Sequence, residues 1–219
     1  MKAEAILFDL DGTLLDTAGD LVGALNRVLA DYELPPVSTN AARPYISTGA
    51  AGLIEYGLGL QRDEANSPEL QKQLVDYYRQ NMSEHTCLFD GMEALLDQLD
   101  QQYRVWGIVT NKITELTVSL LKDLDLLERS HCVVCRDTTA EAKPSPMPLL
   151  HACKLTNLDP KKTLYIGDAL SDIQAANSAE MTSLVAAYGY LMDGEDGSTW
   201  KADGIIHHPD EIVPWLNLD

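Results

Sequence analysis

The sequence predicts an α/β fold, in which a doubly wound parallel sheet carries an all-helical domain inserted after its first strand. Short apolar runs alternate with helical patterns along most of the chain, and each run ends in a polar or glycine-containing turn. The runs are apolar throughout, which is typical of parallel strands that helices cover on both faces. One long segment contains no such run, and this segment predicts the insertion.

The expected strands are the apolar runs at residues 5–8, 105–109, 132–134, 164–166, 183–187 and 205–206. Apolar residues three and four positions apart predict helices between these runs. One such pattern is Met92, Leu95, Leu96 and Leu99, a second is Leu116, Leu120, Leu121 and Leu124, and a third helix is expected over residues 146–155. Strand and helix in alternation are typical of βαβ units.

The segment from about residue 16 to residue 84 shows only helical periodicity, punctuated by prolines. Its two patterns are Leu21, Leu25, Val28 and Leu29, and Leu70, Leu74 and Tyr77. We therefore expect a core domain of residues 1–15 and 86–219 and a helical cap domain of residues 16–85. Ligands of open α/β sheets bind at the carboxyl edge of the strands. A helical domain placed over that edge would form a cleft.

Composition and charge exclude several classes of protein. The 219 residues include 16 Lys and Arg against 34 Asp and Glu, a net charge of -18 that disfavours nucleic acid and anionic membrane surfaces as partners. No apolar run approaches the roughly 20 residues that a bilayer span requires, so we expect a cytoplasmic protein. We also expect a monomer or a small homo-oligomer. Cys132 and Cys135 lie in a β-branched stretch, where residues three apart point to opposite faces. We expect buried reduced thiols there, with redox or metal use as the alternative.

Carboxylates follow two of the expected strands at the point where each strand ends. Asp9 and Asp11 follow the first strand, and Asp168 and Asp172 follow the fourth. Because the carboxyl ends of parallel strands meet at one edge of the sheet, these side chains should lie close together. Like charges at such a distance are costly unless a cation neutralises them, and oxygen ligands suit Mg²⁺, which also binds substrate phosphate. The sequence therefore predicts a Mg²⁺ site.

The same edge of the sheet offers groups for phosphoryl transfer. A carboxylate can attack phosphorus and form an acyl phosphate, while its neighbour in the Asp9 and Asp11 pair protonates the leaving oxygen and later activates water. Thr110 and Asn111 follow the second strand and offer a hydroxyl and backbone N–H groups to phosphoryl oxygens, and Lys143 can add a positive charge. Each aspartate taken singly is more often a turn former or helix cap, but their coincidence at successive strand ends favours chemistry.

These residues resemble the motifs of the haloacid-dehalogenase-like (HAD) phosphohydrolases. The resemblance implies a HAD-like Rossmannoid core, and it runs from the first strand to the last helix. The four motifs, in order, match Asp9-Leu10-Asp11-Gly12-Thr13, Thr110, Lys143, and Gly167-Asp168 with Asp172.

The resemblance also implies a role for each matched residue. It makes Asp9 the nucleophile and Asp11 the general acid and base. Mg²⁺ would be held by the carboxylates of Asp9 and Asp168 and the backbone carbonyl of Asp11, with Asp172 in support, either directly or through water. The phosphoryl group would be bound by Thr110, Asn111 and Lys143.

Details of the motifs imply a subclass. Asp11 separates phosphatases and phosphomutases from dehalogenases, so dehalogenation is not expected. The phosphoglycolate-phosphatase group is most similar in the helical cap and in residues 109–112 and 143–148. Bacterial N-acetylmuramate 6-phosphate phosphatases are also similar, in residues 106–112, 132–135 and 184–190. The resemblance therefore implies a phosphatase of carbohydrate metabolism that acts on a small phosphorylated metabolite.

Two other functions remain open from the residues. A phosphomutase similar to β-phosphoglucomutase would share every motif, and it differs only in what receives the phosphoryl group. A phospho-signalling module also joins an acidic strand edge, Mg²⁺ and a lysine, but such modules are about half as long and have no helical insertion.

The cap is expected to choose the substrate. Arg43 could pair with a substrate carboxylate, or it could form a salt bridge to acids of the cap. The loop at Ser47, Thr48 and Gly49 aligns with the cap loop that faces the site in relatives.

Two residues depart from the pattern of the family. Glu180 stands where a glycine commonly ends the helix, and Arg136 stands where relatives often carry glycine. Both lie outside the proposed chemistry, so we expect them to influence local backbone and cap closure more than activity.

Overall fold

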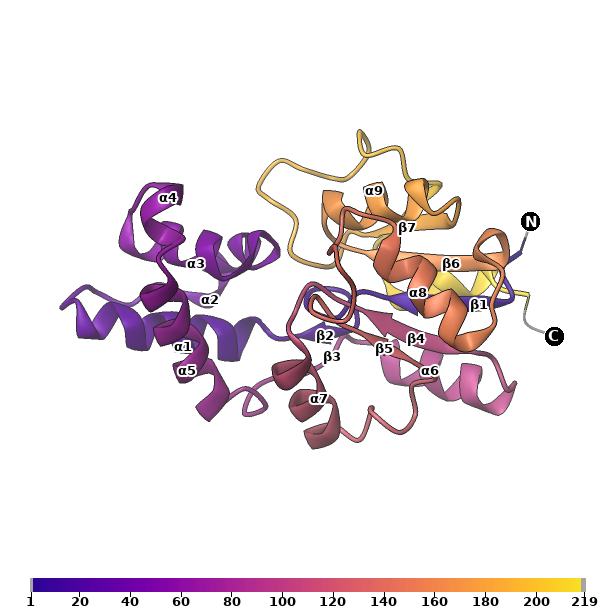
Figure 1. Ribbon diagram of the computed structural model, residues 1–219, viewed down its shortest axis with the longest axis horizontal. Helices are drawn as coiled ribbons and strands as arrows, with labels where there is room; N and C mark the ends of the chain where they lie inside the picture. The colour runs from indigo at the N-terminus through magenta and orange to yellow at the C-terminus, as the bar shows by residue number, and fades with distance from the viewer. Residues whose placement is uncertain (1, 218–219) are drawn as a thin grey trace.

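The computed structural model describes residues 2–217 and contains a six-stranded parallel sheet with the order β5-β4-β1-β6-β7-β8. The chain moves outward from the central strand β1 on one side, returns, and moves outward on the other, which confirms the doubly wound sheet (Figure 1). Every expected strand is present. The strands are β1 (Ala5–Phe8), β4 (Trp106–Val109), β5 (Val133–Val134), β6 (Thr163–Gly167), β7 (Thr182–Ala186) and β8 (Gly204–Ile206).

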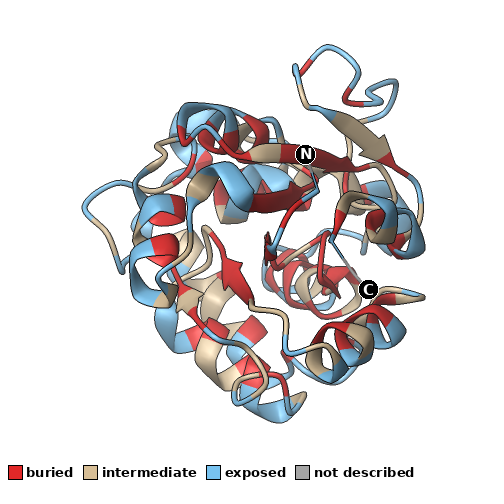
Figure 2. Cartoon of the chain, turned by 90° about the vertical axis from the view of Figure 1, so that its right-hand side faces the viewer, coloured by how far each residue is buried: buried red, intermediate tan, exposed pale blue. Residues whose placement is uncertain are grey.

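Helices cover both faces of this sheet, as the uninterrupted apolar strands predicted. Alternate residues of β1 point to opposite faces. Ile6 and Phe8 join the apolar cluster that includes helices α6 (Met92–Gln101) and α7 (Thr114–Asp123). Leu7 joins the cluster on α8 (Met147–Thr156) and α9 (Leu170–Ser178). Figure 2 shows the strands buried and the outward faces of the helices exposed.

The elements between residues 17 and 86 are helices, as expected, and they lie apart from the sheet (Figure 1). The periodicity identified the buried face of the first helix, because Leu25, Val28 and Leu29 are buried there. In the last helix of this segment the buried aromatic residue is Tyr78, whereas Tyr77 is only half-buried. These elements are α1 (Ala18–Asp31), α2 (Thr39–Ala42), the 3₁₀ helix η1 (Arg43–Thr48), α3 (Gly49–Leu58), α4 (Arg62–Ala65) and α5 (Pro68–Gln80).

A short antiparallel ribbon was not predicted. Strand β2 (Leu15–Asp16) pairs with β3 (Cys87–Leu88), where the chain leaves the sheet for the helices and where it returns. Two residues are too few to produce a periodic pattern, so the sequence carried no signal for this pair. The ribbon lies at the ends of the segment 16–85, which we propose as the cap domain.

The cysteines are free, and Cys132 and Cys135 are buried. Burial raises the pKa of the Cys132 thiol to about 11 and also raises that of Cys135. Both groups are therefore uncharged near neutral pH, which agrees with the expected reduced thiols. In the described part of the chain, no helix combines the length and apolar character needed to cross a bilayer.

Candidate active site

The loop after β1 packs closely against the loop after β6. Gly12 has a φ of +84°, and a Cβ atom at this position would lie 2.2 Å from Oδ2 of Asp168. Only glycine accepts both this backbone conformation and this approach. The contact brings the first and the fourth motif together.

Three of the predicted carboxylates form one buried group. Asp9, Asp168 and Asp172 each offer an oxygen, and these oxygens all lie within 4.8 Å of one another. The side chain of Asp11 is not part of this group, which fits the implied use of its backbone carbonyl. Three carboxylate oxygens at this separation are a donor set that suits a hard divalent cation.

Lys143 lies between two of these carboxylates and is itself buried. Its Nζ is 2.8 Å from Oδ1 of Asp9 and 2.7 Å from Oδ1 of Asp172. It also donates to the carbonyl of Val109 at 3.0 Å and lies 2.9 Å from the hydroxyl of Tyr165. Burial opposes the charge on the lysine, but the Asp172 and Asp9 carboxylates raise the pKa of Lys143 above its usual range.

Asp168 is held by three donors from different parts of the chain. The Thr13 hydroxyl donates to Oδ1 at 3.0 Å, and the Tyr190 backbone N–H donates to Oδ2 at 2.9 Å. The third donor is Ser47 of η1, whose hydroxyl lies 3.1 Å from the same Oδ2. A residue of the helical segment therefore touches a carboxylate of the sheet edge directly.

Burial and mutual repulsion shift the titration of the acidic group. Burial, with the charges of Asp172 and Asp168, raises the pKa of Asp9 well above its ordinary value, although Lys143 opposes this shift. Burial and the charge of Asp172 raise the pKa of Asp168 to about 7. The protein alone therefore leaves this group short of positive charge near neutral pH.

Thr110 and Asn111 lie beside these carboxylates, at the end of β4. The Asn111 side chain is already engaged, because it accepts from the Lys143 backbone N–H and donates to the Lys143 carbonyl, both at 3.1 Å. Its backbone N–H has no hydrogen bond to any described residue. Thr110 is buried, and its hydroxyl accepts a hydrogen bond from the Lys112 N–H.

Two residues bind the carboxylate of Asp11. The Thr17 hydroxyl donates to Oδ1 at 2.7 Å, and the Lys112 ammonium lies 2.9 and 3.2 Å from the two carboxylate oxygens. The Lys112 ammonium also lies 4.5 Å from the ring centroid of Tyr78 in α5. Lys112 is thus a buried residue of the cleft and not a solvated residue at the start of a helix.

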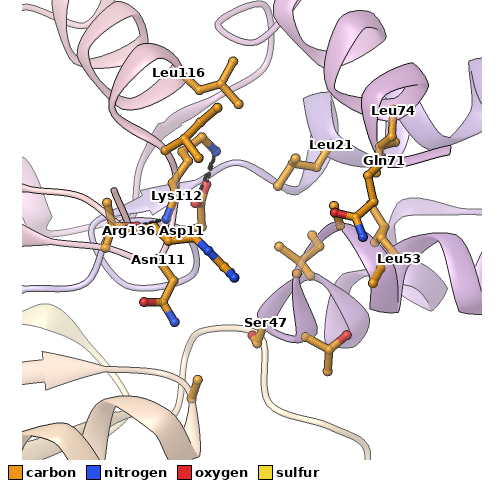
Figure 3. Close-up of a pocket in the computed structure, with 18 of the residues that line it drawn as sticks. Asp11, Leu21, Ser47, Leu53, Gln71, Leu74, Asn111, Lys112, Leu116 and Arg136 are labelled. Carbon is orange, nitrogen blue, oxygen red and sulfur yellow. Dashed lines mark hydrogen bonds and ion pairs between the residues drawn. The ribbon is translucent and has the colours of Figure 1, made fainter. Parts of the chain in front are cut away.

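A cavity of about 600 Å³ opens above these groups, and its lining joins the sheet edge to the helical segment (Figure 3). The lining includes most of the predicted site residues, namely Asp9, Asp11, Ser47, Thr48, Gly49, Thr110, Asn111, Lys143 and Asp168. Asp172 is fully buried and is not among the described lining residues. It lies behind Lys143 in the first turn of α9, where its carboxylate accepts from the N–H of the N-cap residue Ala169 at 3.0 Å.

Arg43 also lies outside the described lining of the cavity. Its guanidinium lies 3.0 Å from Oδ2 of Asp16 and 4.9 Å from the ring centroid of Tyr190. Arg43 therefore forms a salt bridge to an acid, which was the alternative expectation. The structure does not favour contact between Arg43 and a substrate carboxylate.

Sequence reasoning missed three residues of the site. Tyr165 was interpreted only as an apolar strand residue, yet its hydroxyl lies 3.2 Å from Oδ1 of Asp172. Tyr78 is 2% exposed and lines the cavity, and only its helical spacing from Leu74 could have marked it. Arg136 lines the cavity as well, a place that the sequence did not predict for it. Its departure from the family pattern was the available signal.

Comparisons with known proteins identify the family of this chain. The pattern of the family described as "Haloacid dehalogenase-like hydrolase" matches residues 6–186. An N-acetylmuramic acid 6-phosphate phosphatase of Pseudomonas putida is 35% identical over 212 residues, which cover 97% of this chain and 95% of the relative. A phosphoglycolate phosphatase of Xanthomonas campestris pv. campestris is 36% identical over 208 residues, which cover 95% and 94%.

Solved structures show the same fold. The crystal structure of a "predicted phosphoglycolate phosphatase" from Haemophilus somnus superposes with a TM-score of 0.84 at 28% identity, covering 98% of both chains. The family pattern, the relatives that match over nearly the whole chain, and the fold agree with one another. The chain therefore belongs to the haloacid dehalogenase-like hydrolases and is a phosphoric monoester hydrolase.

Proposed function

We propose that this hydrolase is a Mg²⁺-dependent phosphatase that works through a phosphoaspartate on Asp9. The observation that carries the proposal is the buried group of Asp9, Asp168 and Asp172, which Lys143 neutralises only in part. Mg²⁺ would be held by the carboxylates of Asp9 and Asp168 and the carbonyl of Asp11. It would supply charge neutralisation for the phosphoryl oxygens.

Asp9 would act as the nucleophile. One of its oxygens contacts Lys143, while Oδ2 has no hydrogen bond or ion pair with any described residue. That oxygen would attack phosphorus, and the P–O bond to the leaving group breaks with its electron pair on the ester oxygen. Thr110, the free N–H of Asn111 and Lys143 would bind the other phosphoryl oxygens.

Asp11 supplies and recovers the proton. It lies two residues from the nucleophile and its orientation is set by Thr17 and Lys112. In the first step Asp11 gives its proton to the departing ester oxygen. In the second it takes a proton from water, whose oxygen attacks phosphorus, so that phosphate leaves and the Asp9 carboxylate is restored.

The cap domain would close this site against bulk water. Ser47 donates to Oδ2 of Asp168 and to the Tyr190 carbonyl, both at 3.1 Å, so a cap residue touches the sheet edge in this structure. Exclusion of water strengthens electrostatic interactions in the site and protects the acyl phosphate from uncontrolled hydrolysis. We place this activity in the cytoplasm and expect a monomer or a small homo-oligomer.

Phosphoglycolate is the first candidate substrate, because relatives over nearly the whole chain carry that name. N-acetylmuramate 6-phosphate is the second. A relative at 35% identity carries that name, and a cavity of about 600 Å³ leaves room for a sugar. A phosphomutase reaction would leave the phosphoryl group on an isomer of the substrate instead of releasing it.

The test is phosphate release from both candidate substrates and from p-nitrophenyl phosphate, with Mg²⁺ or with EDTA. Asp9→Asn should abolish turnover and the phosphoenzyme that mass spectrometry detects in the wild type, whereas Asp90→Asn, at an exposed position, should keep both. Normal Mg²⁺-dependent turnover by Asp9→Asn would refute the mechanism. Formation of phosphorylated isomers without phosphate release would favour the mutase.

A further inference from the structure

Arg136 lines the cavity from an exposed position and carries an unpaired positive charge in a strongly acidic protein. Among the described residues, it is the arginine whose side chain has no ion pair or hydrogen bond, although acids outnumber bases by 34 to 16. Figure 3 shows its side chain extending into the cavity from the same wall as Asn111 and Lys112. The arginines with partners are Arg27, Arg43, Arg62, Arg79, Arg104 and Arg129.

The backbone that carries Arg136 is fixed on both sides. The Arg136 N–H donates to the Lys112 carbonyl at 3.1 Å, and the Cys135 N–H donates to the Thr138 hydroxyl at 2.9 Å. Because the loop is already ordered, binding through Arg136 costs little further backbone entropy.

The nearby acids do not neutralise this guanidinium. Asp137 follows it in the chain, but Oδ1 of Asp137 accepts from the N–H and the hydroxyl of Thr114, at 2.9 and 2.6 Å. These bonds lower the pKa of Asp137 and hold its carboxylate at the start of α7. Asp11, on the cavity wall, is already paired with Lys112.

We propose that the natural substrate carries a carboxylate in its leaving group and that Arg136 binds this carboxylate. The proposal rests on the proposed function, because it assigns the part of the substrate that is not the phosphoryl group. The planar guanidinium offers two parallel N–H donors that match a carboxylate.

The charges in the cavity favour one carboxylate over a second phosphate. The other cations of the lining are engaged, Lys112 by Asp11 and Lys143 by Asp9 and Asp172, and Arg62 lies 3.3 Å from Glu55. One free positive charge balances the single negative charge of a carboxylate. A second phosphate monoester carries nearly two negative charges, and part of that charge would remain uncompensated.

The rest of the cavity suits a leaving group larger than two carbons. Leu21, Leu53 and Leu74 line its cap side, and the Tyr78 hydroxyl is buried without a hydrogen bond to any described residue. A buried polar group of this kind gains from a ligand that can pair with it. A carboxylated sugar phosphate would use the apolar side, the hydroxyl and Arg136 together.

The experiment compares pairs of phosphomonoesters that differ in the carboxylate. One pair is phosphoglycolate and its amide, and the other is N-acetylmuramate 6-phosphate and N-acetylglucosamine 6-phosphate, which lacks the lactyl carboxylate. The quantity measured is the carboxylate preference, defined as the ratio of kcat/KM values within a pair. In the wild type the preference should be at least about 10-fold for one of the pairs.

Arg136→Gln should lower this preference by about 10- to 100-fold, mainly through KM, since a charge-assisted bond is lost. Arg136→Lys should keep part of it, because an ammonium retains the charge without the planar fork. The control is Arg27→Gln, at an exposed site on α1, which should leave the preference at the wild-type value. The Tm of each variant reports whether it is folded.

A wild type without the preference, or Arg136→Gln with an unchanged preference, would overturn the assignment. If Arg136→Gln lowers kcat/KM equally for both members of a pair, the ratio stays unchanged. This result would show that Arg136 binds the phosphoryl group instead. These results are separable from failure of the proposed function. Mg²⁺-dependent release of phosphate from p-nitrophenyl phosphate that requires Asp9 shows that the proposed function stands even if the carboxylate preference is absent.

Discussion

The ammonium group of Lys112 contacts both carboxylate oxygens of Asp11, at 2.9 and 3.2 Å, while Tyr78 of the helical segment lies over the same ammonium. Burial opposes the charge on this lysine, but Asp11 raises the pKa of Lys112 above its usual range. Lys112 therefore stays charged throughout the working pH range. Its position makes it a positioning residue for the proposed general acid and base.

Lys112→Met should lower kcat/KM for alkyl phosphates by about 10- to 100-fold, because Asp11 loses the partner that orients it, and a positioned acid or base contributes about 10²- to 10⁴-fold. The loss should be smaller for p-nitrophenyl phosphate, whose leaving group departs without a proton. The control is Lys122→Met, at an exposed position of α7. Equal losses on both substrates would show that Lys112 acts on binding and not through Asp11.

Removing Lys143 should destabilise the protein as well as inactivate it. Lys143→Met leaves Asp9 and Asp172 buried without their shared cation, and breaking a buried pair in this way costs about 3–5 kcal/mol. Denaturant unfolding in EDTA measures the loss. Lys154→Met, at an exposed position of α8, is the matched control. A variant as stable as this control would contradict the assigned role.

The pKa of Asp168, raised to about 7, predicts how the metal-free protein responds to pH. Between pH 3.8 and 7 the folded state binds more protons than the unfolded state, so the stability contributed by this group falls as pH rises through this window. Asp168→Asn should therefore be more stable than the wild type in EDTA at pH 7.5, and the difference should vanish near pH 4.

Magnesium should reverse this effect in the wild type. A cation that binds only the folded, deprotonated group adds stability by mass action. The rise in Tm on adding Mg²⁺ should therefore grow from pH 5 to pH 7 and then level off, and it should be absent in Asp168→Asn. A Mg²⁺ shift that does not depend on pH would contradict the assignment of Asp168 as a ligand.

Glu180 should be replaceable by glycine with a gain in stability. Its φ of +57° lies in the left-handed region, where a Cβ atom is unfavourable, and this is the position at which the sequence departs from the usual glycine. Glu180→Gly should raise Tm by about 2–4 °C. The exposed ion pair with Lys161 that is lost should contribute little. Glu180→Ala, which loses the same ion pair but keeps Cβ, should show no gain.

Much of the fold could be predicted because each strand is a continuous apolar run and each large helix has one buried face. Ile6 to Phe8 and Leu164 to Ile166 are fully buried, as such runs require. The ribbon of β2 and β3 could not be predicted, because its pairing joins residues about 70 positions apart with two residues on each side. The choice between Tyr77 and Tyr78 depended on how α5 is rotated against α1 and α3.

The sequence alone determined which residues can do chemistry, because motif order and strand ends bring Asp9, Asp11 and Asp168 to one edge of a parallel sheet. Only the tertiary structure decided which charges are already balanced. Whether Arg43 or Arg136 keeps a free guanidinium depends on which carboxylates lie within about 4 Å of each, and those contacts join segments distant in sequence. Electrostatic pairing acts at this short range in space, so a sequence supplies the charges, and the fold decides which of them remain available to a substrate.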